Sequence, residues 1–154
     1  MEKSIRGNKI HFYFEDVTVQ LKDRTRLKSF IASLFKREKK QLNNLNYVFC
    51  SDRALLKINQ DYLGHDFYTD IISFNFSDAG SPIQGEIYIS RDRVVENSRI
   101  FQSTLKRELL RVIFHGALHL CGYLDKTKRQ KLVMTQREDF YLKLWDKFHV
   151  KHID

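Results

Sequence analysis

The chain of 154 residues has few of the residues that mark linkers between domains. It contains one proline, Pro82, and six glycines, and no Gly/Ser-rich or Pro-rich stretch separates two regions of different composition. With 42% hydrophobic residues, the chain is long enough to bury one substantial core and leaves little room for a second. We therefore expect a single domain that spans residues 1–154.

Cysteine is equally scarce. Cys50 and Cys121 are the two cysteines, and neither belongs to a CxxC pair, so the sequence excludes a disulfide framework and predicts free, buried thiols. Nowhere do about eighteen apolar residues run together, as a membrane span requires. The first eight residues are polar and lack the apolar run of a signal peptide. These absences predict a cytoplasmic protein.

Positive charge is in excess, with a net charge of +8 and an isoelectric point near 9.5. Because neutralised phosphates release counterions, this excess favours contact with a polyanion, although composition does not choose between RNA and DNA. The alternative is that the basic residues only solvate helix faces and ends. They form three clusters: Lys22, Arg24, Arg26 and Lys28; Lys36, Arg37, Lys39 and Lys40; and Lys126, Lys128, Arg129 and Lys131.

The hydrophobic pattern predicts an α+β fold, in which several helices pack on a small mixed β-sheet. Strands are expected where apolar residues alternate, and helices where they recur at three- and four-residue steps. The last two strands in the sequence should form a broad hairpin. The expected strands span 10–14, 45–50, 71–76 and 86–90, and the expected helices span 24–36, a short stretch between 51 and 64, 91–99, 103–121 and the residues after 127.

Two of these helices carry finer predictions. The short helix should turn Leu55, Ile58 and Tyr62 inward. Thr127 and Gln130 have the spacing of a capping box, which would open the last helix. That helix is expected to bury Leu132, Met134, Tyr141, Leu142 and Trp145.

The helix expected at 103–121 carries the candidate site. Its second half is apolar almost all round, so it should be central and buried. His115 and His119 stand four residues apart on one face and can present two imidazole nitrogens to one metal ion. A buried polar side chain is costly unless it has a partner, and a metal ion is one such partner. The alternative is that both histidines are hydrogen-bonded core residues.

Two residues after this helix favour the metal. Gly122 suits a left-handed position that turns the chain back, which would bring Asp125 under the histidines as a third ligand. Three protein ligands leave a position for water, as in catalytic zinc sites. The donors favour one zinc ion, although nickel, cobalt or iron would accept them too. Gly116 stands where HExxH metalloproteases have their glutamate base, which disfavours that class.

The segment from His115 to Asp125 resembles the His-Gly-x-Leu-His-Leu-x-Gly-Tyr signature of the YbeY family of bacterial rRNA-maturation endoribonucleases. Two further segments agree: residues 69–74 are similar to the family's Thr-Asp-Val-Leu-Ser-Phe strand, and residues 85–90 to its Gly-Asp-Ile strand. Met134 and Glu138 resemble its closing Met-x-x-x-Glu. The resemblance covers most of the chain from Leu55 onward.

The resemblance implies a zinc-dependent enzyme that cleaves single-stranded RNA, with His115, His119 and Asp125 as its metal ligands. It also implies a role in maturing the 3′ end of 16S ribosomal RNA in the small ribosomal subunit, and in ribosome quality control. The positive charge suits that substrate. Asp70 and Glu86 lie in the matching strands, but neither is assigned a catalytic role, and Asp70 is expected to make structural hydrogen bonds.

Three positions depart from the family pattern. Asp125 stands where most members have histidine, Leu63 where an arginine is usual, and Tyr68 where a proline is usual. Without the arginine, the site lacks a cation that could steady a phosphate group. The alternative function is therefore a non-catalytic, zinc-containing ribosome-assembly factor that binds rRNA or a ribosomal protein. Metal-dependent hydrolysis of a substrate other than RNA has only the ligand set in its favour.

Overall fold

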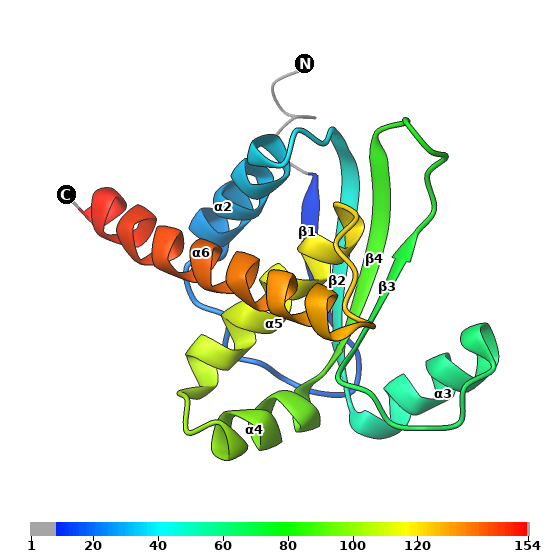
Figure 1. The fold of residues 1–154 in the computed structure, drawn as a ribbon. Coiled ribbons are helices and arrows are strands. Elements are labelled where there is room, and N and C mark those ends of the chain that lie inside the picture. Colours follow the sequence, from blue (N-terminus) through cyan, green and yellow to red (C-terminus); the bar gives the residue numbers. More distant parts are fainter. Residues whose placement is uncertain (1–8, 154) are drawn as a thin grey trace.

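The structure is a computed structural model that describes residues 9–153, with side chains to Phe148, so the polar segment 1–8 lies outside the described residues. The predicted order of strands and helices is confirmed. The first and third strands start where they are expected, and the second and fourth strands each start three residues earlier than expected. The elements are β1 (Ile10–Phe14), α2 (Arg24–Arg37), β2 (Leu42–Cys50), α3 (Asp52–Leu63), β3 (Ile71–Asn75), β4 (Ile83–Ser90), α4 (Arg91–Ile100), α5 (Leu105–Leu120) and α6 (Lys128–Ile153) (Figure 1).

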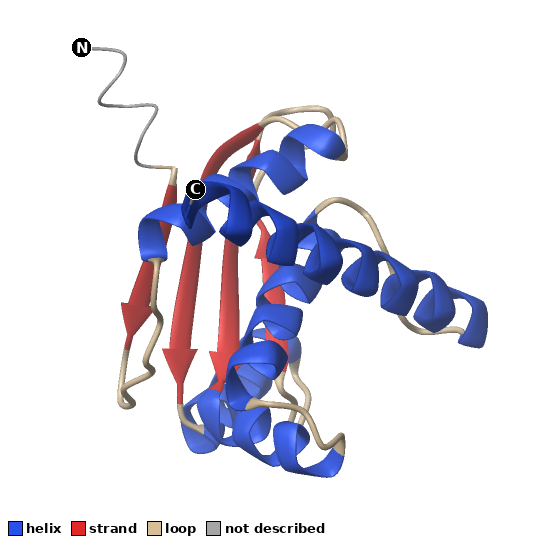
Figure 2. Ribbon diagram, turned by 90° about the vertical axis from the view of Figure 1, so that its left-hand side faces the viewer, coloured by secondary structure: helices blue, strands red, loops and turns tan. Residues whose placement is uncertain are grey.

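The strands form one mixed four-stranded sheet in the order β1-β2-β4-β3. β1 and β4 both pair in parallel with β2, and β3 pairs antiparallel with β4 as the predicted hairpin. Figure 2 shows most of the helices over one face of this sheet. On the opposite face, Leu55 of α3 packs with Cys50 and Ile72 in a small separate cluster. The predicted α+β class is confirmed.

The main core lies between the sheet and α2, α5 and α6. Because side chains alternate along a strand, Leu45, Tyr47 and Phe49 of β2 all point to the helical face, and all are fully buried. The Tyr47 hydroxyl donates to the main-chain oxygen of Ile113 in α5 at 2.8 Å, which satisfies the polar end of a core side chain. The predicted burial of the second half of α5 is confirmed, since its apolar residues from Leu109 to Leu120 are almost completely shielded.

A glycine lets α5 approach the sheet. A Cβ atom at Gly116 would lie 2.9 Å from both Cγ2 and Cδ1 of Ile87 in β4, and 3.0 Å from Cδ1 of Ile71 in β3. Carbon atoms do not approach so closely without displacement. Gly116 lowers the helix propensity of α5, but the side chains of the sheet leave no room for a larger residue at this position. The glycine therefore sets the distance between α5 and strands β3 and β4.

One helix start follows the predicted chemistry, and one helix end departs from the usual chemistry. Thr127 Oγ1 accepts from the Gln130 amide at 3.1 Å, and Gln130 Oε1 accepts from the Thr127 amide at 3.1 Å, so the capping box is confirmed. After α2, Lys39 adopts a left-handed conformation with φ of 59°, where glycine is the usual residue. For a residue with a Cβ atom this conformation costs about 1 kcal/mol.

Two predictions of burial are wrong. Tyr62 is 73% exposed, because it lies near the end of α3, where that helix extends past the sheet; its ring contacts the Phe74 ring. Asn59 is buried in its place and donates to the Phe67 carbonyl at 2.9 Å. Leu132 is 60% exposed, because it lies off the helical stripe of α6 that includes Met134.

The prediction of free, buried thiols is confirmed. Cys50 and Cys121 are free and buried, and burial raises the pKa of each thiol to about 12. A thiol with such a pKa stays protonated and unreactive at neutral pH. Within residues 9–153, none of the helices combines the length and the hydropathy needed to cross a membrane.

Replacing Gly116 with alanine should destabilise the fold despite the better helix propensity. We expect the free energy of unfolding in urea to fall by about 1–2 kcal/mol, because the new methyl group overlaps the Ile87 side chain. In an Ile87→Ala background the same substitution should cost less, which a double-mutant cycle would measure. A Gly116→Ala protein as stable as the wild type would contradict the packing argument.

Candidate metal centre

One face of α5 carries a line of polar residues through an otherwise apolar helix. Glu108, Arg111, His115 and His119 follow one another at steps of three and four residues, so their side chains lie along the same side. The two histidine rings lie with their centroids 4.5 Å apart and almost perpendicular to each other, at 84°. The last turn of α5 therefore presents two imidazoles together, as the sequence predicts.

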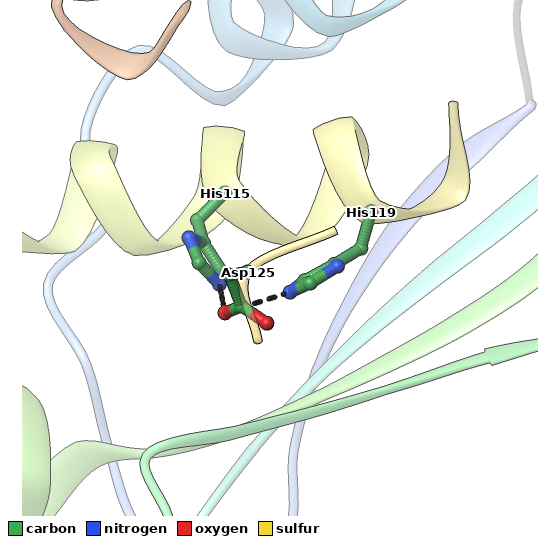
Figure 3. A group of neighbouring side chains, drawn as sticks. All are labelled: His115, His119 and Asp125. Carbon is green, nitrogen blue, oxygen red and sulfur yellow. Dashed lines mark hydrogen bonds and ion pairs between the residues drawn. The ribbon is translucent and has the colours of Figure 1, made fainter. Parts of the chain in front are cut away.

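The turn after α5 brings in the third residue. Gly122 has φ of 108°, and the Tyr123 amide donates back to the Leu118 carbonyl at 3.1 Å, so the chain reverses directly after the helix. As a result, Oδ2 of Asp125 lies 3.3 Å from Nε2 of His115 and 3.3 Å from Nε2 of His119 (Figure 3). Candidate ligand atoms of the three residues lie within 4.8 Å of one another. The structure thus brings together the three residues that the sequence singles out.

The hydrogen bonds of the histidines leave both Nε2 atoms directed at the same point. Nδ1 of His119 lies 2.9 Å from the Tyr123 carbonyl oxygen, which accepts only, so this nitrogen is the donor. Nδ1 of His115 lies 2.5 Å from a carboxylate oxygen of Glu138. Two imidazole lone pairs and one carboxylate then converge, an arrangement that suits a cation. The donor set therefore fits a divalent metal ion.

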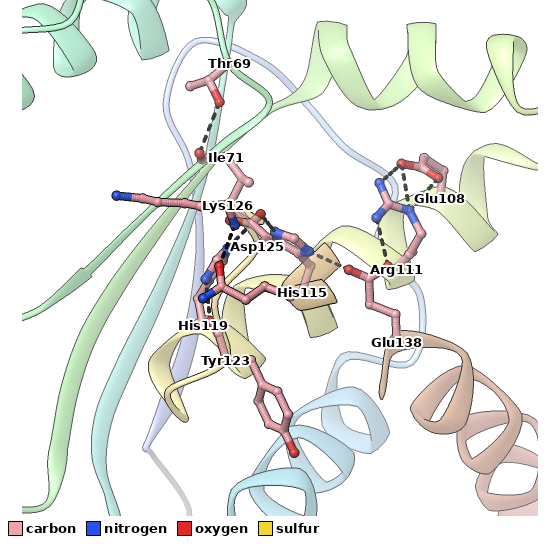
Figure 4. A network of polar contacts seen from close by, with 11 residues as sticks. Thr69, Ile71, Glu108, Arg111, His115, His119, Tyr123, Asp125, Lys126 and Glu138 are labelled. Carbon is pink, nitrogen blue, oxygen red and sulfur yellow. Dashed lines mark hydrogen bonds and ion pairs between the residues drawn. The ribbon is translucent and has the colours of Figure 1, made fainter. Parts of the chain in front are cut away.

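Glu138 of α6 belongs to a network that supports His115. Its side chain is only 5% exposed, and its second oxygen accepts from Nη1 of Arg111 at 3.1 Å. Arg111 also donates to both oxygens of Glu108 (Figure 4). Burial works to lower the pKa of Arg111, but the hydrogen bonds with Glu108 and the charge of Glu138 outweigh it and raise the pKa. The guanidinium therefore remains charged between two buried carboxylates.

A second network supports His119 through the turn. The Tyr123 hydroxyl donates to Oε1 of Glu38, at the end of α2, at 2.8 Å. The other oxygen of Glu38 accepts from Arg137 at 2.6 Å and from the Tyr141 hydroxyl. Burial alone would raise the pKa of Glu38, but these hydrogen bonds lower it below its ordinary value. The loop that carries Asp125 is thus tied to two helices.

The two carboxylates of the matching strands lie apart from this cluster. Glu86 accepts from the Tyr88 hydroxyl at 2.7 Å, and both residues lie on the face of the sheet opposite to Ile87 and α5. Asp70 is half-buried, and it is its main-chain oxygen that accepts from the Ser90 amide at 2.9 Å. Among the described residues no side-chain hydrogen bond of Asp70 is found, so the structural hydrogen bonding expected of its carboxylate is not confirmed.

Sequence reasoning missed the supporting residues Arg111, Glu108 and Glu38. For the first two a signal existed, because both share the helical face of His115 and a buried charged residue needs a partner. For Glu38 the sequence contains no such signal, since 85 positions separate it from Tyr123. Only the packing of α2 against α6 joins them.

Fold and site together define the class of protein: an α+β protein with a candidate two-histidine, one-carboxylate metal centre at the end of a buried helix. The family profile described as "Endoribonuclease YbeY" matches residues 10–146. The chain belongs to the YbeY family.

Individual relatives agree over nearly their whole length. The protein named endoribonuclease YbeY from Cytophaga hutchinsonii is 47% identical over 88% of this chain and 94% of its own. The protein of the same name from Flavobacterium psychrophilum is 44% identical over 92% of this chain and 98% of its own. A Thermotoga maritima protein with a known solution structure superposes with a TM-score of 0.62 at 27% identity, covering 92% of this chain and 93% of that protein.

Removing the charge of Glu138 should weaken metal binding without unfolding the protein. In Glu138→Gln the side chain still accepts from His115 but no longer draws electron density onto the imidazole as a carboxylate does, so we expect about 10- to 100-fold lower affinity for Zn²⁺. Competition with a chromophoric chelator would measure it. The exposed carboxylate of Glu96 offers a matched control, Glu96→Gln, which should bind like the wild type. Equal affinities for all three proteins would contradict the support assigned to Glu138.

Glu38 should stabilise the fold in a pH-dependent way. Because its pKa in the folded protein lies below the ordinary value of 4.5, its contribution is present above that pH and is lost as the pH falls through the folded pKa. Glu38→Gln should therefore unfold more easily by about 2 kcal/mol at pH 7. The difference from the wild type should shrink in urea unfolding below pH 4. A difference that stays constant with pH would show that the ionised form is not what stabilises.

Proposed function

We propose that this protein is a metal-dependent endoribonuclease that cleaves phosphodiester bonds of single-stranded RNA. Its proposed substrate is ribosomal RNA of the small subunit, in maturation of the 16S 3′ end and in ribosome quality control, and its proposed location is the cytoplasm. The observation that carries the proposal is the convergence of both histidine Nε2 atoms on Asp125. Membership of the YbeY family and relatives named endoribonuclease support it. We propose that residues 1–154 act as one domain.

The proposed metal ligands are Nε2 of His115, Nε2 of His119 and the carboxylate of Asp125. Two imidazoles with one carboxylate favour zinc, and fewer than four protein ligands are characteristic of a catalytic ion. When bound, the ion would supply Lewis-acid activation of the scissile phosphate and of the attacking water.

The protein's own groups hold this arrangement in place. Glu138 and the Tyr123 carbonyl keep the Nδ1 protons of the two histidines, so that both Nε2 atoms remain free to bind. Gly122 and the capping box of α6 fix both ends of the loop that carries Asp125. Asp125 is half-buried, with 39% of its side chain exposed, so the cluster reaches the surface, where a polymer can approach it.

A second function has one observation in its favour. Leu63, at the end of α3, is 43% exposed and stands where the resemblance implies an arginine. Without that cation, a protein with the same metal site could bind ribosomal RNA or a ribosomal protein as an assembly factor and not cleave. The metal would then serve as a structural clip.

Cleavage of a synthetic single strand with the sequence of a 16S 3′ end distinguishes the two functions. We expect cleavage by the wild type, and a loss of more than about 100-fold in His115→Ala/His119→Ala and in the presence of a chelator. Metal content should fall in parallel, and added Zn²⁺ should restore the wild type alone. The double variant, purified alongside, excludes a contaminating nuclease.

If the wild type binds one metal ion and binds RNA but does not cleave it, the assembly function is favoured. In that case Leu63→Arg becomes informative, because cleavage gained with this single change would identify the missing cation as the cause.

A further inference from the structure

A depression with four lysines lies where α2 connects to β2. It has a volume of about 570 Å³, and the lysines around it are Lys9, Lys36, Lys39 and Lys40. The side-chain amides of Gln41 and Asn43 also line it, and no acidic residue does. Lys9 directly precedes β1, so the four come together only in the folded chain.

The ammonium groups of these four lysines differ from the guanidinium groups of several arginines in the protein. Arg93, Arg107, Arg111 and Arg137 each form an ion pair with a carboxylate. Over the described side chains, residues 9–148, no ion pair is found for any of the four lysines of the depression. Several unpaired positive charges around one concave surface attract a polyanion, and contact with phosphates would release its counterions.

Lys39 provides an independent observation. It holds a left-handed conformation, with φ of 59°, at the position after a helix where glycine is the least costly residue. Strain of this kind persists where a side chain serves a purpose other than stability. The Lys39 side chain is exposed and forms no ion pair with the described side chains, so its charge is available at this surface.

The depression lies close to the metal centre. Figure 1 shows α5 running toward the end of the sheet at which α2 connects to β2. Glu38, next to Lys39, accepts from Tyr123 in the turn that carries Asp125. A single polymer could contact the lysines and the metal centre at once.

We propose that Lys9, Lys36, Lys39 and Lys40 bind phosphate groups of a single RNA strand, outside the metal centre, and so hold the strand across the end of α5. This proposal rests on the proposed function, because it takes RNA as the occupant. A membrane surface fits less well, since the depression carries no exposed aromatic or large aliphatic side chain that would enter a lipid layer.

The test measures binding separately from cleavage. Fluorescence anisotropy with a labelled single-stranded RNA, in the presence of a chelator, would compare the wild type with Lys36→Gln/Lys39→Gly/Lys40→Gln. A control of equal charge, Lys57→Gln/Lys106→Gln/Lys143→Gln, changes three exposed lysines elsewhere. We expect roughly tenfold weaker binding for the first variant only, with the slope of log K against log salt reduced by about 0.7 for each lost contact.

Lys39→Gly alone separates binding from stability. Its thermal unfolding midpoint should not fall below that of the wild type, because glycine relieves the left-handed strain, while its RNA affinity should fall. Equal RNA affinity of the Lys36→Gln/Lys39→Gly/Lys40→Gln variant and the control variant, or no RNA binding by the wild type, would overturn the proposal. So would loss of binding to phosphatidylglycerol vesicles with unchanged affinity for RNA, which would identify a membrane surface.

The outcome is independent of whether the protein cleaves RNA. RNA binding that depends on the lysines, without cleavage, would support the proposed RNA-binding role of the depression and contradict the proposed endoribonuclease activity. Cleavage by the wild type, with RNA binding that is unchanged by the lysine substitutions, would support the endoribonuclease activity and contradict the RNA-binding role of the depression.

Discussion

The burial of α5 is the constraint on which the rest of the structure depends. This helix packs so closely on β3 and β4 that only glycine fits at position 116, and it is shielded on nearly every side by α2, α6 and the sheet. Each polar side chain that α5 turns into the fold must then find a partner there, because an unpaired buried charge costs several kcal/mol. Arg111 finds Glu108 and Glu138, and His115 finds Glu138 as well.

The candidate metal centre is a consequence of that requirement. With both Nδ1 atoms engaged by acceptors, the histidines have only their Nε2 atoms left, and these face the single carboxylate that the Gly122 turn delivers. Two supporting networks converge here from different parts of the chain, one through α6 and one through the end of α2. A rigid site results, in which the candidate ligands are oriented before any ion arrives.

The charge of the protein is distributed unevenly around this site. Many arginines are neutralised by ion pairs that hold helices together, such as Arg137 with Glu38 between α6 and the end of α2. The lysines near the end of α2 are not neutralised in this way, and one of them occupies a strained backbone position. Part of the net charge of +8 is therefore carried by the four lysines around the depression at the end of α2.

Local information in the sequence determined much of this protein. Hydrophobic periodicity located each strand and helix, the spacing of Thr127 and Gln130 determined the start of α6, and the four-residue step from His115 to His119 determined a shared face, because each depends on neighbours within a few positions. Tertiary structure decided the rest. Which apolar residues stay exposed, as Tyr62 does, depends on where a helix leaves the sheet. The sequence could not show that Glu138 supports His115 or that Glu38 supports Tyr123, because residues close to a buried charge in the sequence do not indicate which distant residue will pair with it. Only the packing of α2, α5 and α6 determines which groups meet.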